Sequence, residues 1–184
     1  MQMPDMETHR LLLRATREAD GPACLDIWLD DEMGRFLADP PRAKADESEL
    51  NFAHGIEDDD GWYPMVAFHK HSGEFLGTCS VVPMENGGRW DLGYAVHKKY
   101  WRQGYATEML QKLIELGNAQ GVNSFSADVA QANTASNALL KKLGFCVWKD
   151  TESFRKRGTD IVYPKFTYKL EGCTSAKISS VRML

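Results

Sequence analysis

The stretch from Asp91 to Glu108 constrains the fold of this chain more than any other part of the sequence. It opens with a segment typical of a β-strand, continues as a short basic segment, and leads into a helix that should begin near Gly104. The first N–H groups of a helix have no backbone partner and lie at the positive end of the helix dipole. Gly104 lets the backbone approach a ligand closely, and Arg102 adds a permanent charge with several donors. The run predicts an anion site that suits a diphosphate, with ordinary helix capping as the alternative.

The pattern along the whole chain predicts one domain of the α/β (α+β) class. From Ala106 to Gly117, apolar residues recur every three or four positions, which indicates one buried helix face. We expect helices at residues 18–30, 44–58, 106–117 and 133–143. We expect strands at residues 9–14, 64–69, 74–82, 89–96, 124–129, 145–148 and 161–170. This order predicts a mixed sheet, antiparallel in its first half and with a helical crossover in its second half.

Length and charge limit the classes of function. A chain of 184 residues suits one domain, which we place at residues 8–170 with a tail at 171–184. Its net charge of −4 argues against a general nucleic-acid surface, because phosphate backbones demand clustered Lys and Arg. The longest apolar runs are far shorter than the ~20 residues of a membrane span. The N-terminus has no secretory pattern, so we expect a cytoplasmic protein without a membrane partner.

The cysteines and histidines give no metal signature. Cys24, Cys79, Cys146 and Cys173 lie far apart, without a Cys-x-x-Cys pair. Zinc sites require clustered ligands at short, regular spacings. We therefore expect no metal, and cysteines that behave as small reduced apolar residues.

Two linked segments resemble GNAT acetyltransferases. Gly104-x-Ala106 is similar to the pyrophosphate loop of that family, in which an Arg or Gln usually stands three residues before the Gly. Here Trp101 occupies that position. The run Trp-x-x-Gly-Tyr-Ala-Thr-Glu resembles the branch that acetylates the N-termini of ribosomal proteins. A second match runs from Asn133-x-x-Ser136 to Gly144-Phe145, and the resemblance extends from about His9 to Leu170.

The resemblance implies a mostly antiparallel sheet flanked by about four helices, with acetyl-CoA as cosubstrate and no metal. It implies that the strand before the loop splays from its neighbour, so that the backbone at Ala95 and Val96 meets the thioester and pantetheine. It also implies that Asn133 bonds the pantetheine amides, with capping of the following helix as the alternative. The loop residues expected to contact the coenzyme are Arg102, Gln103, Gly104, Tyr105, Ala106 and Thr107.

Acyl transfer from a thioester to an amine needs a neutral amine, a stabilised oxyanion and a proton for the leaving thiolate. Many family members supply that proton from a Tyr four residues before the Gly of the Gly-Phe pair, where this chain has Leu140. Ser136 or a bound water is therefore the candidate donor, although Ser136 also suits a hydroxyl satisfied within the first helical turn. Asp91 is the candidate proton relay for the amine, with a solvent-facing acid as the alternative.

These observations predict an N-acetyltransferase in which a primary amine attacks the bound thioester directly. The favoured acceptor is the α-amine of a peptide or protein. The alternatives are a small-molecule amine, such as a polyamine or aminoglycoside, and a non-catalytic acyl-CoA-binding module. The sequence leaves open whether the protein is a monomer or a homodimer. We expect the acceptor to be cationic and held near acidic residues of the variable segments, namely Asp30, Asp31, Glu32, Asp39 and Asp58 to Asp60.

Overall fold

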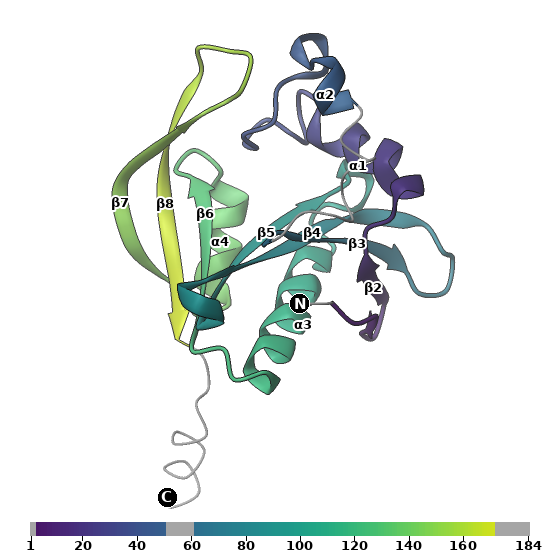
Figure 1. Ribbon diagram of the computed structural model, residues 1–184, viewed down its shortest axis with the longest axis vertical. Helices are drawn as coiled ribbons and strands as arrows, with labels where there is room; N and C mark the ends of the chain where they lie inside the picture. Colours follow the sequence, from purple (N-terminus) through teal and green to yellow (C-terminus); the bar gives the residue numbers. More distant parts are fainter. Residues whose placement is uncertain (1–2, 51–60, 172–184) are drawn as a thin grey trace, which may run out of the picture.

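A mixed eight-stranded sheet forms the centre of the computed structural model, which describes residues 3–50 and 61–171 (Figure 1). Its strand order is β1-β2-β3-β4-β5-β6-β8-β7, and β5 and β6 are the parallel neighbours in an otherwise antiparallel sheet. The strands are β1 (Met6–Glu7), β2 (Leu11–Ala15), β3 (Tyr63–His69), β4 (Phe75–Met84), β5 (Arg89–Val96), β6 (Ser124–Ala130), β7 (Cys146–Arg155) and β8 (Val162–Glu171). The predicted mixed, mostly antiparallel sheet is confirmed.

Helices lie on both sides of this sheet. They are α1 (Gly21–Trp28), α2 (Glu47–Leu50), α3 (Tyr105–Ala119) and α4 (Thr134–Lys142). In Figure 1, α1 and α2 lie above strands β3 to β5, α3 lies below them, and α4 lies beside β6. Within residues 3–50 and 61–171, no helix is long and apolar enough to cross a bilayer.

Three expected elements differ from the structure or extend beyond its described part. The helix expected at 44–58 is described only as a 3-10 turn and the short α2, and its remainder lies outside the described residues. The expected tail also lies outside them from residue 172 onward. The strand expected at 145–148 is wrong in length, because β7 continues to Arg155 by pairing with β8. Almost every β7 side chain is exposed, so no hydrophobic alternation marks the strand in the sequence.

Close packing of α3 on the sheet sets the position of its N-terminus. Leu113 is fully buried, and Trp90 and Phe125 pack edge to face beneath the helix. A Cβ on Gly117 would lie 2.5 Å from the Phe125 ring and 3.1 Å from Trp90, so the helix approaches the sheet more closely than any other residue would allow there. This packing holds the first turn of α3 beside the end of β5.

Candidate active site

The parallel strands β5 and β6 separate after a short common stretch. They pair at Arg89–Ser124, Trp90–Phe125 and Asp91–Ser126, and the register between them stops there. Beyond this point β5 continues to Val96 along β4, while β6 continues to Ala130 along β8. The separation leaves a wedge between the two strands, as the family resemblance predicts.

Backbone groups of β5 point into this wedge. The N–H of His97 donates to Leu76 O on β4 at 2.9 Å. This bond shows which backbone N–H groups of β5 point toward β4. Because N–H groups alternate between the two edges of an antiparallel strand, those of Tyr94 and Val96 face the wedge. Ala95 lies opposite Thr78, and its N–H faces β4. The geometry thus favours Tyr94 and Val96, and not Ala95, as the source of free amides.

The loop between β5 and α3 presents a row of free amides. Gly104 caps the helix with a left-handed φ of 83°, and Arg102 adopts a φ of 60°. Within the described chain, the N–H groups of residues 102–107 have no backbone partner. Consecutive amides turned by left-handed residues form a concave anion site, and the helix dipole adds to it. The predicted loop residues Arg102, Gln103, Gly104, Tyr105, Ala106 and Thr107 therefore lie together at one end of the wedge.

Arg10 supports this loop, a contact that the sequence did not predict. Its guanidinium donates to Gln103 O at 2.9 Å and lies 4.2 Å above the centre of the Tyr105 ring. Glu108 holds Arg10 at 2.7 Å and also accepts from Thr8, which joins β2 to the first turn of α3. Burial would raise the pKa of Glu108, but the hydrogen bonds from Thr8 and Arg10 lower it below its ordinary value. The loop is thereby held in place without a ligand.

Trp101 also holds the loop in place. Its indole N–H donates to Val96 O at 2.6 Å, although the ring itself is 41% exposed. This bond joins the loop to the end of β5 from the position where the family pattern has Arg or Gln. It occupies the carbonyl of Val96 and leaves its amide free.

Two residues predicted for the site, Asn133 and Ser136, lie at the start of α4, which faces the wedge. Asn133 caps the helix, because its side-chain oxygen accepts from the Ser136 amide at 3.2 Å. The capping reading of Asn133 is thus confirmed, and coenzyme binding by its remaining amide group stays a prediction. Leu140, at the family's usual Tyr position, is completely buried in the core.

Tyr94 is a functional candidate that the sequence reading missed. Its side chain points from β5 to Ser136, and its buried hydroxyl has no hydrogen bond of good geometry within the described residues. Burial raises the pKa of the phenol to about 12, and the Ser136 hydroxyl offsets part of that rise. The sequence predicts that neighbouring side chains of β5 point to opposite faces of the sheet. It does not predict which of them meets Ser136, because that depends on how α4 packs against β5.

Asp91 lies on the opposite face of β5, at the base of the wedge. Its carboxylate accepts from Ser126 Oγ at 2.6 Å, and Arg89 contacts the same hydroxyl at 2.7 Å. Burial raises the pKa of Asp91 and outweighs the hydrogen bond of Ser126. Asp91 thus lies on one face of β5, and Ser136 approaches Tyr94 on the other face.

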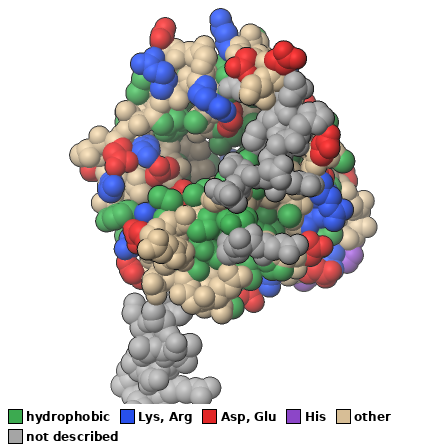
Figure 2. All heavy atoms as spheres, in the orientation of Figure 1, with side chains coloured by type: hydrophobic (Ala, Val, Ile, Leu, Met, Phe, Trp, Pro, Cys, Tyr) green, Lys and Arg blue, Asp and Glu red, His purple; other side chains and the backbone are tan. Residues whose placement is uncertain are grey.

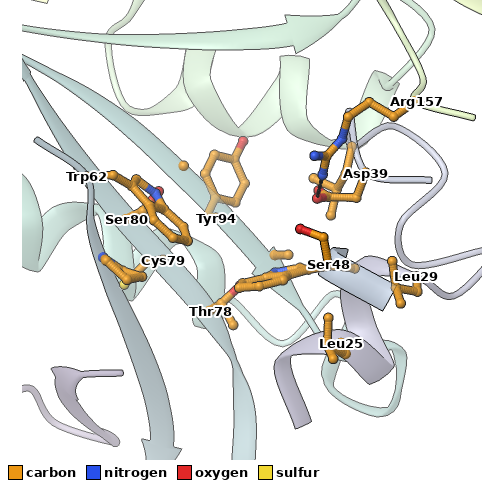
Figure 3. A pocket seen from close by; sticks show the side chains of 15 residues that line it. Leu25, Leu29, Asp39, Ser48, Trp62, Thr78, Cys79, Ser80, Tyr94 and Arg157 are labelled. Atoms are coloured by element: carbon orange, nitrogen blue, oxygen red, sulfur yellow. Dashed lines mark hydrogen bonds and ion pairs between the residues drawn. The ribbon is translucent and has the colours of Figure 1, made fainter. Parts of the chain in front are cut away.

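A cavity of about 390 Å³ opens on the Asp91 side of β5. Gly93, Tyr94 and Ala95 line it from β5, Thr78 and Ser80 line it from β4, and α1 forms the opposite wall (Figure 3). Asp91, two residues from Gly93, is adjacent to the cavity without lining it. The cavity therefore reaches the strand that borders the wedge, where an acceptor would approach a bound thioester.

The structure describes four members of the expected acidic rim, Asp30, Asp31, Glu32 and Asp39. Of its described members only Asp39 lines the cavity, and it is paired with Arg157 at 2.6 Å. Asp30 accepts from the amides of the following turn, and Glu32 pairs with Lys98. Asp58 to Asp60 lie outside the described residues. In the described chain no three His, Cys, Asp or Glu side chains gather where they could hold a metal ion.

Known proteins share this arrangement. The family profile described as an acetyltransferase (GNAT) domain matches residues 10–146, which include the wedge, the loop and α4. The chain belongs to the GNAT family. It is accordingly an acetyl-CoA-dependent acyltransferase. It is 28% identical over 150 residues to an uncharacterized N-acetyltransferase, p20, of Bacillus licheniformis, with 78% of this chain and 83% of that protein covered.

Solved GNAT structures share the fold at low sequence identity. An acetyltransferase from Salmonella typhimurium that modifies the N-terminal serine of ribosomal protein L7/L12 has a TM-score of 0.70 and 19% identity, covering 89% of this chain and 96% of its own. Spermidine N-acetyltransferase from Vibrio cholerae has a TM-score of 0.75 and 13% identity, covering 89% and 96%. These GNAT proteins act on different amines, so the fold does not select the acceptor.

Proposed function

We propose that this GNAT protein transfers the acetyl group of acetyl-CoA to a primary amine, and that the α-amine of a peptide or protein is the favoured acceptor. The wedge between β5 and β6 carries this proposal. Free loop amides lie at one end of the wedge, and an acceptor cavity opens on the other side of β5. We assign the acetyltransferase unit to residues 8–170 and the tail to residues 171–184.

The free amides fit the coenzyme that the family uses. The amides of residues 102–107 suit the diphosphate, with Arg102 as the nearby cation. Lys98 and Lys99 are already paired with Glu32 and Glu74. The amides of Tyr94 and Val96 would orient the pantetheine arm and thioester, and the side-chain amide of Asn133 would add a contact from α4. Acetyl-CoA supplies an acyl group already activated as a thioester.

Groups on the two faces of β5 suit the two proton transfers. Asp91, whose pKa is raised by burial, would accept a proton from the amine, directly or through water. Ser136 and Tyr94 would donate to the leaving sulfur. Direct attack by the amine is favoured over a thiol intermediate, because burial raises the pKa of the nearby Cys79 to about 12 and keeps its thiol protonated.

An α-amine suits a single carboxylate base better than the amine of a lysine side chain does. At pH 7, deprotonating an amine of pKa near 10.4 costs about 4.6 kcal/mol, against about 1.1 kcal/mol for an α-amine near 7.8. A single buried carboxylate is a modest base. The described cavity wall also has no surplus negative charge to hold a polyamine.

Coenzyme binding is tested at Gly104. We expect Gly104→Glu to weaken acetyl-CoA binding by more than about 100-fold, because it places a negative charge among the loop amides. Gly104→Ala is the matched control, since both variants carry the same left-handed strain of about 1 kcal/mol and only Glu adds charge. Isothermal calorimetry on folded protein measures both. Equal affinities for Ala and Glu variants would show that the diphosphate binds elsewhere.

Coenzyme A release, measured with a panel of amines and peptides, tests the transfer itself. Release that depends on the added amine, with an acetylated product of the expected mass, supports an enzyme. Tight acetyl-CoA binding without release for any amine would favour the non-catalytic acyl-CoA-binding module.

A further inference from the structure

The acceptor cavity has a wall of apolar and aromatic side chains. Leu25 and Trp28 of α1 and the capping residue Leu29 form one side, and Leu37 and Trp62 contribute from the segments that follow α1 and precede β3 (Figure 3). In the view of Figure 2, hydrophobic side chains gather near the centre of the molecule's face, and charged side chains of both signs lie toward its edge. An acceptor would thus enter between a charged periphery and an apolar interior.

The two tryptophans give the cavity a defined shape. Their ring centroids are 6.4 Å apart and their planes are inclined by 53°. The indole N–H of Trp28 donates to Thr78 Oγ1 on β4 at 3.0 Å, which fixes the ring against the sheet. Thr78 lies opposite Ala95, beside the wedge. A group seated against these indoles would therefore place its attached amine near the thioester.

The charge on the cavity wall is balanced. Among the described lining residues, Asp39 and Arg157 carry the charge, and they neutralise each other in one ion pair. The Arg157 amide also donates to Ala38 O at 2.9 Å, and the buried Lys156 ammonium donates to Gly34 O at 2.7 Å. The turn between β7 and β8 is thereby bound to the segment beside Asp39. The pair is thus held by backbone contacts as well as by its own attraction.

An apolar wall suits the chemistry of the attack. The amine must be neutral to attack, and an apolar environment disfavours the charged ammonium form. An acceptor with a large apolar group would lose water-exposed surface on binding, whereas a polycation would lose hydration without gaining a countercharge from the described lining residues.

We propose that the acceptor is a primary amine whose adjacent carbon carries an aromatic or bulky aliphatic group, seated against the aromatic wall formed by Trp28 and Trp62. For a peptide this means a large apolar N-terminal residue. The inference rests on the proposed function and narrows its acceptor. Both a peptide and a free arylalkylamine present this chemistry.

Four acceptors at equal concentration test the proposal: Phe-Gly-Gly, Gly-Gly-Gly, phenethylamine and spermidine. Coenzyme A release and product mass give kcat/KM for each. We expect Phe-Gly-Gly to exceed Gly-Gly-Gly by about 10-fold or more. Comparing kcat/KM for phenethylamine with that for Phe-Gly-Gly shows whether the acceptor is a free arylalkylamine or a peptide. A preference for Gly-Gly-Gly or spermidine would overturn the inference while leaving acetyl transfer intact, and no acetylation of any amine would overturn the proposed function itself.

Variants connect the preference to the cavity. Trp62→Ala should raise KM for Phe-Gly-Gly about 10-fold or more and leave KM for acetyl-CoA unchanged. Trp62→Phe should restore most of the affinity, because it retains an aromatic surface. Val147→Ala truncates an apolar side chain that is 44% exposed on β7, outside the described cavity lining, and should leave both constants unchanged. If Phe-Gly-Gly binds equally well to folded Trp62→Ala, the proposed seat is wrong.

Discussion

At the scale of single residues, the hydroxyls of Ser136 and Tyr94 face each other across the wedge from different elements. Neither is a strong acid, and the phenol, with its pKa raised to about 12, stays protonated at neutral pH. We expect Ser136→Ala and Tyr94→Phe each to lower kcat by about 100-fold, because proton donation acts in the transition state. Acetyl-CoA affinity should change little.

A double variant shows whether the two hydroxyls act together. If they do, Ser136→Ala combined with Tyr94→Phe should lose no more activity than the more damaging single change. Thr134→Ala is the control, because it removes an exposed hydroxyl from the same helical turn. Unchanged kcat in both single variants, where chemistry limits the rate, would leave Ser136 with a structural role only.

The raised pKa of Asp91 gives a second prediction at this scale. A base works in its charged form, so activity should fall as the pH drops through the pKa of Asp91. Protonation of the amine acts in the same direction, so log kcat/KM should change with a slope of 2 below the raised pKa of Asp91, about 1 between that pKa and the pKa of the amine, and about 0 above both. Asp91→Asn should keep the slope near 1 at every pH below the pKa of the amine.

Ser126→Ala is the matched change for this test. Removing the hydroxyl removes a hydrogen bond that favours the charged carboxylate, so the pKa of Asp91 should rise further. The pH at which the slope of log kcat/KM changes should therefore be higher than in wild type. Identical pH profiles for wild type and Asp91→Asn would exclude Asp91 as the base.

At the scale of elements, the contact between α3 and the sheet holds the loop that precedes α3. Gly117→Ala would place a Cβ 2.5 Å from Phe125, and we expect it to lower the free energy of unfolding by about 1–3 kcal/mol. Urea denaturation measures this change. Gln111→Ala on the exposed side of α3 should stay within about 0.5 kcal/mol of wild type. Equal stability of the two variants would mean that α3 packs less closely than described.

At the scale of the whole molecule, two carboxylates join β2 to the helices. Glu108 binds Arg10 on one side, and Asp20 binds Arg14 at 2.7 Å on the other. Burial would raise the pKa of Asp20, but the hydrogen bonds of Arg14 and of the Arg17 amide bring it below its ordinary value. Both carboxylates therefore stabilise the fold above their unfolded pKa values of about 3.9 and 4.3, and this stability is lost as the pH falls through the lower folded values.

Urea denaturation at several pH values checks this dependence. Wild type should lose stability below about pH 4.5, and Asp20→Asn should be less stable at pH 7 and less sensitive to acid. Asp26→Asn is the control, because Asp26 forms an exposed pair with Arg42 that contributes little. An acid dependence unchanged by Asp20→Asn would show that other groups control it.

The sequence by itself determined the features that arise within one short segment. The strand, basic loop and helix around Gly104 present a row of free amides because these amides belong to consecutive residues. The helix and strand order was predicted for the same reason, since periodicity is a local property. The length of β7 was missed, because its exposed side chains leave no pattern and its pairing with β8 decides its extent.

Only the tertiary structure decided what lies across the wedge and around the cavity. Tyr94 meets Ser136 because the register of β5 and the packing of α4 bring them together. Asp39 and Arg157 pair across 118 residues of sequence, which neutralises the one described member of the expected acidic rim that lines the cavity. Contacts between distant segments depend on register and close packing, and neither is encoded in the spacing of residues along the chain.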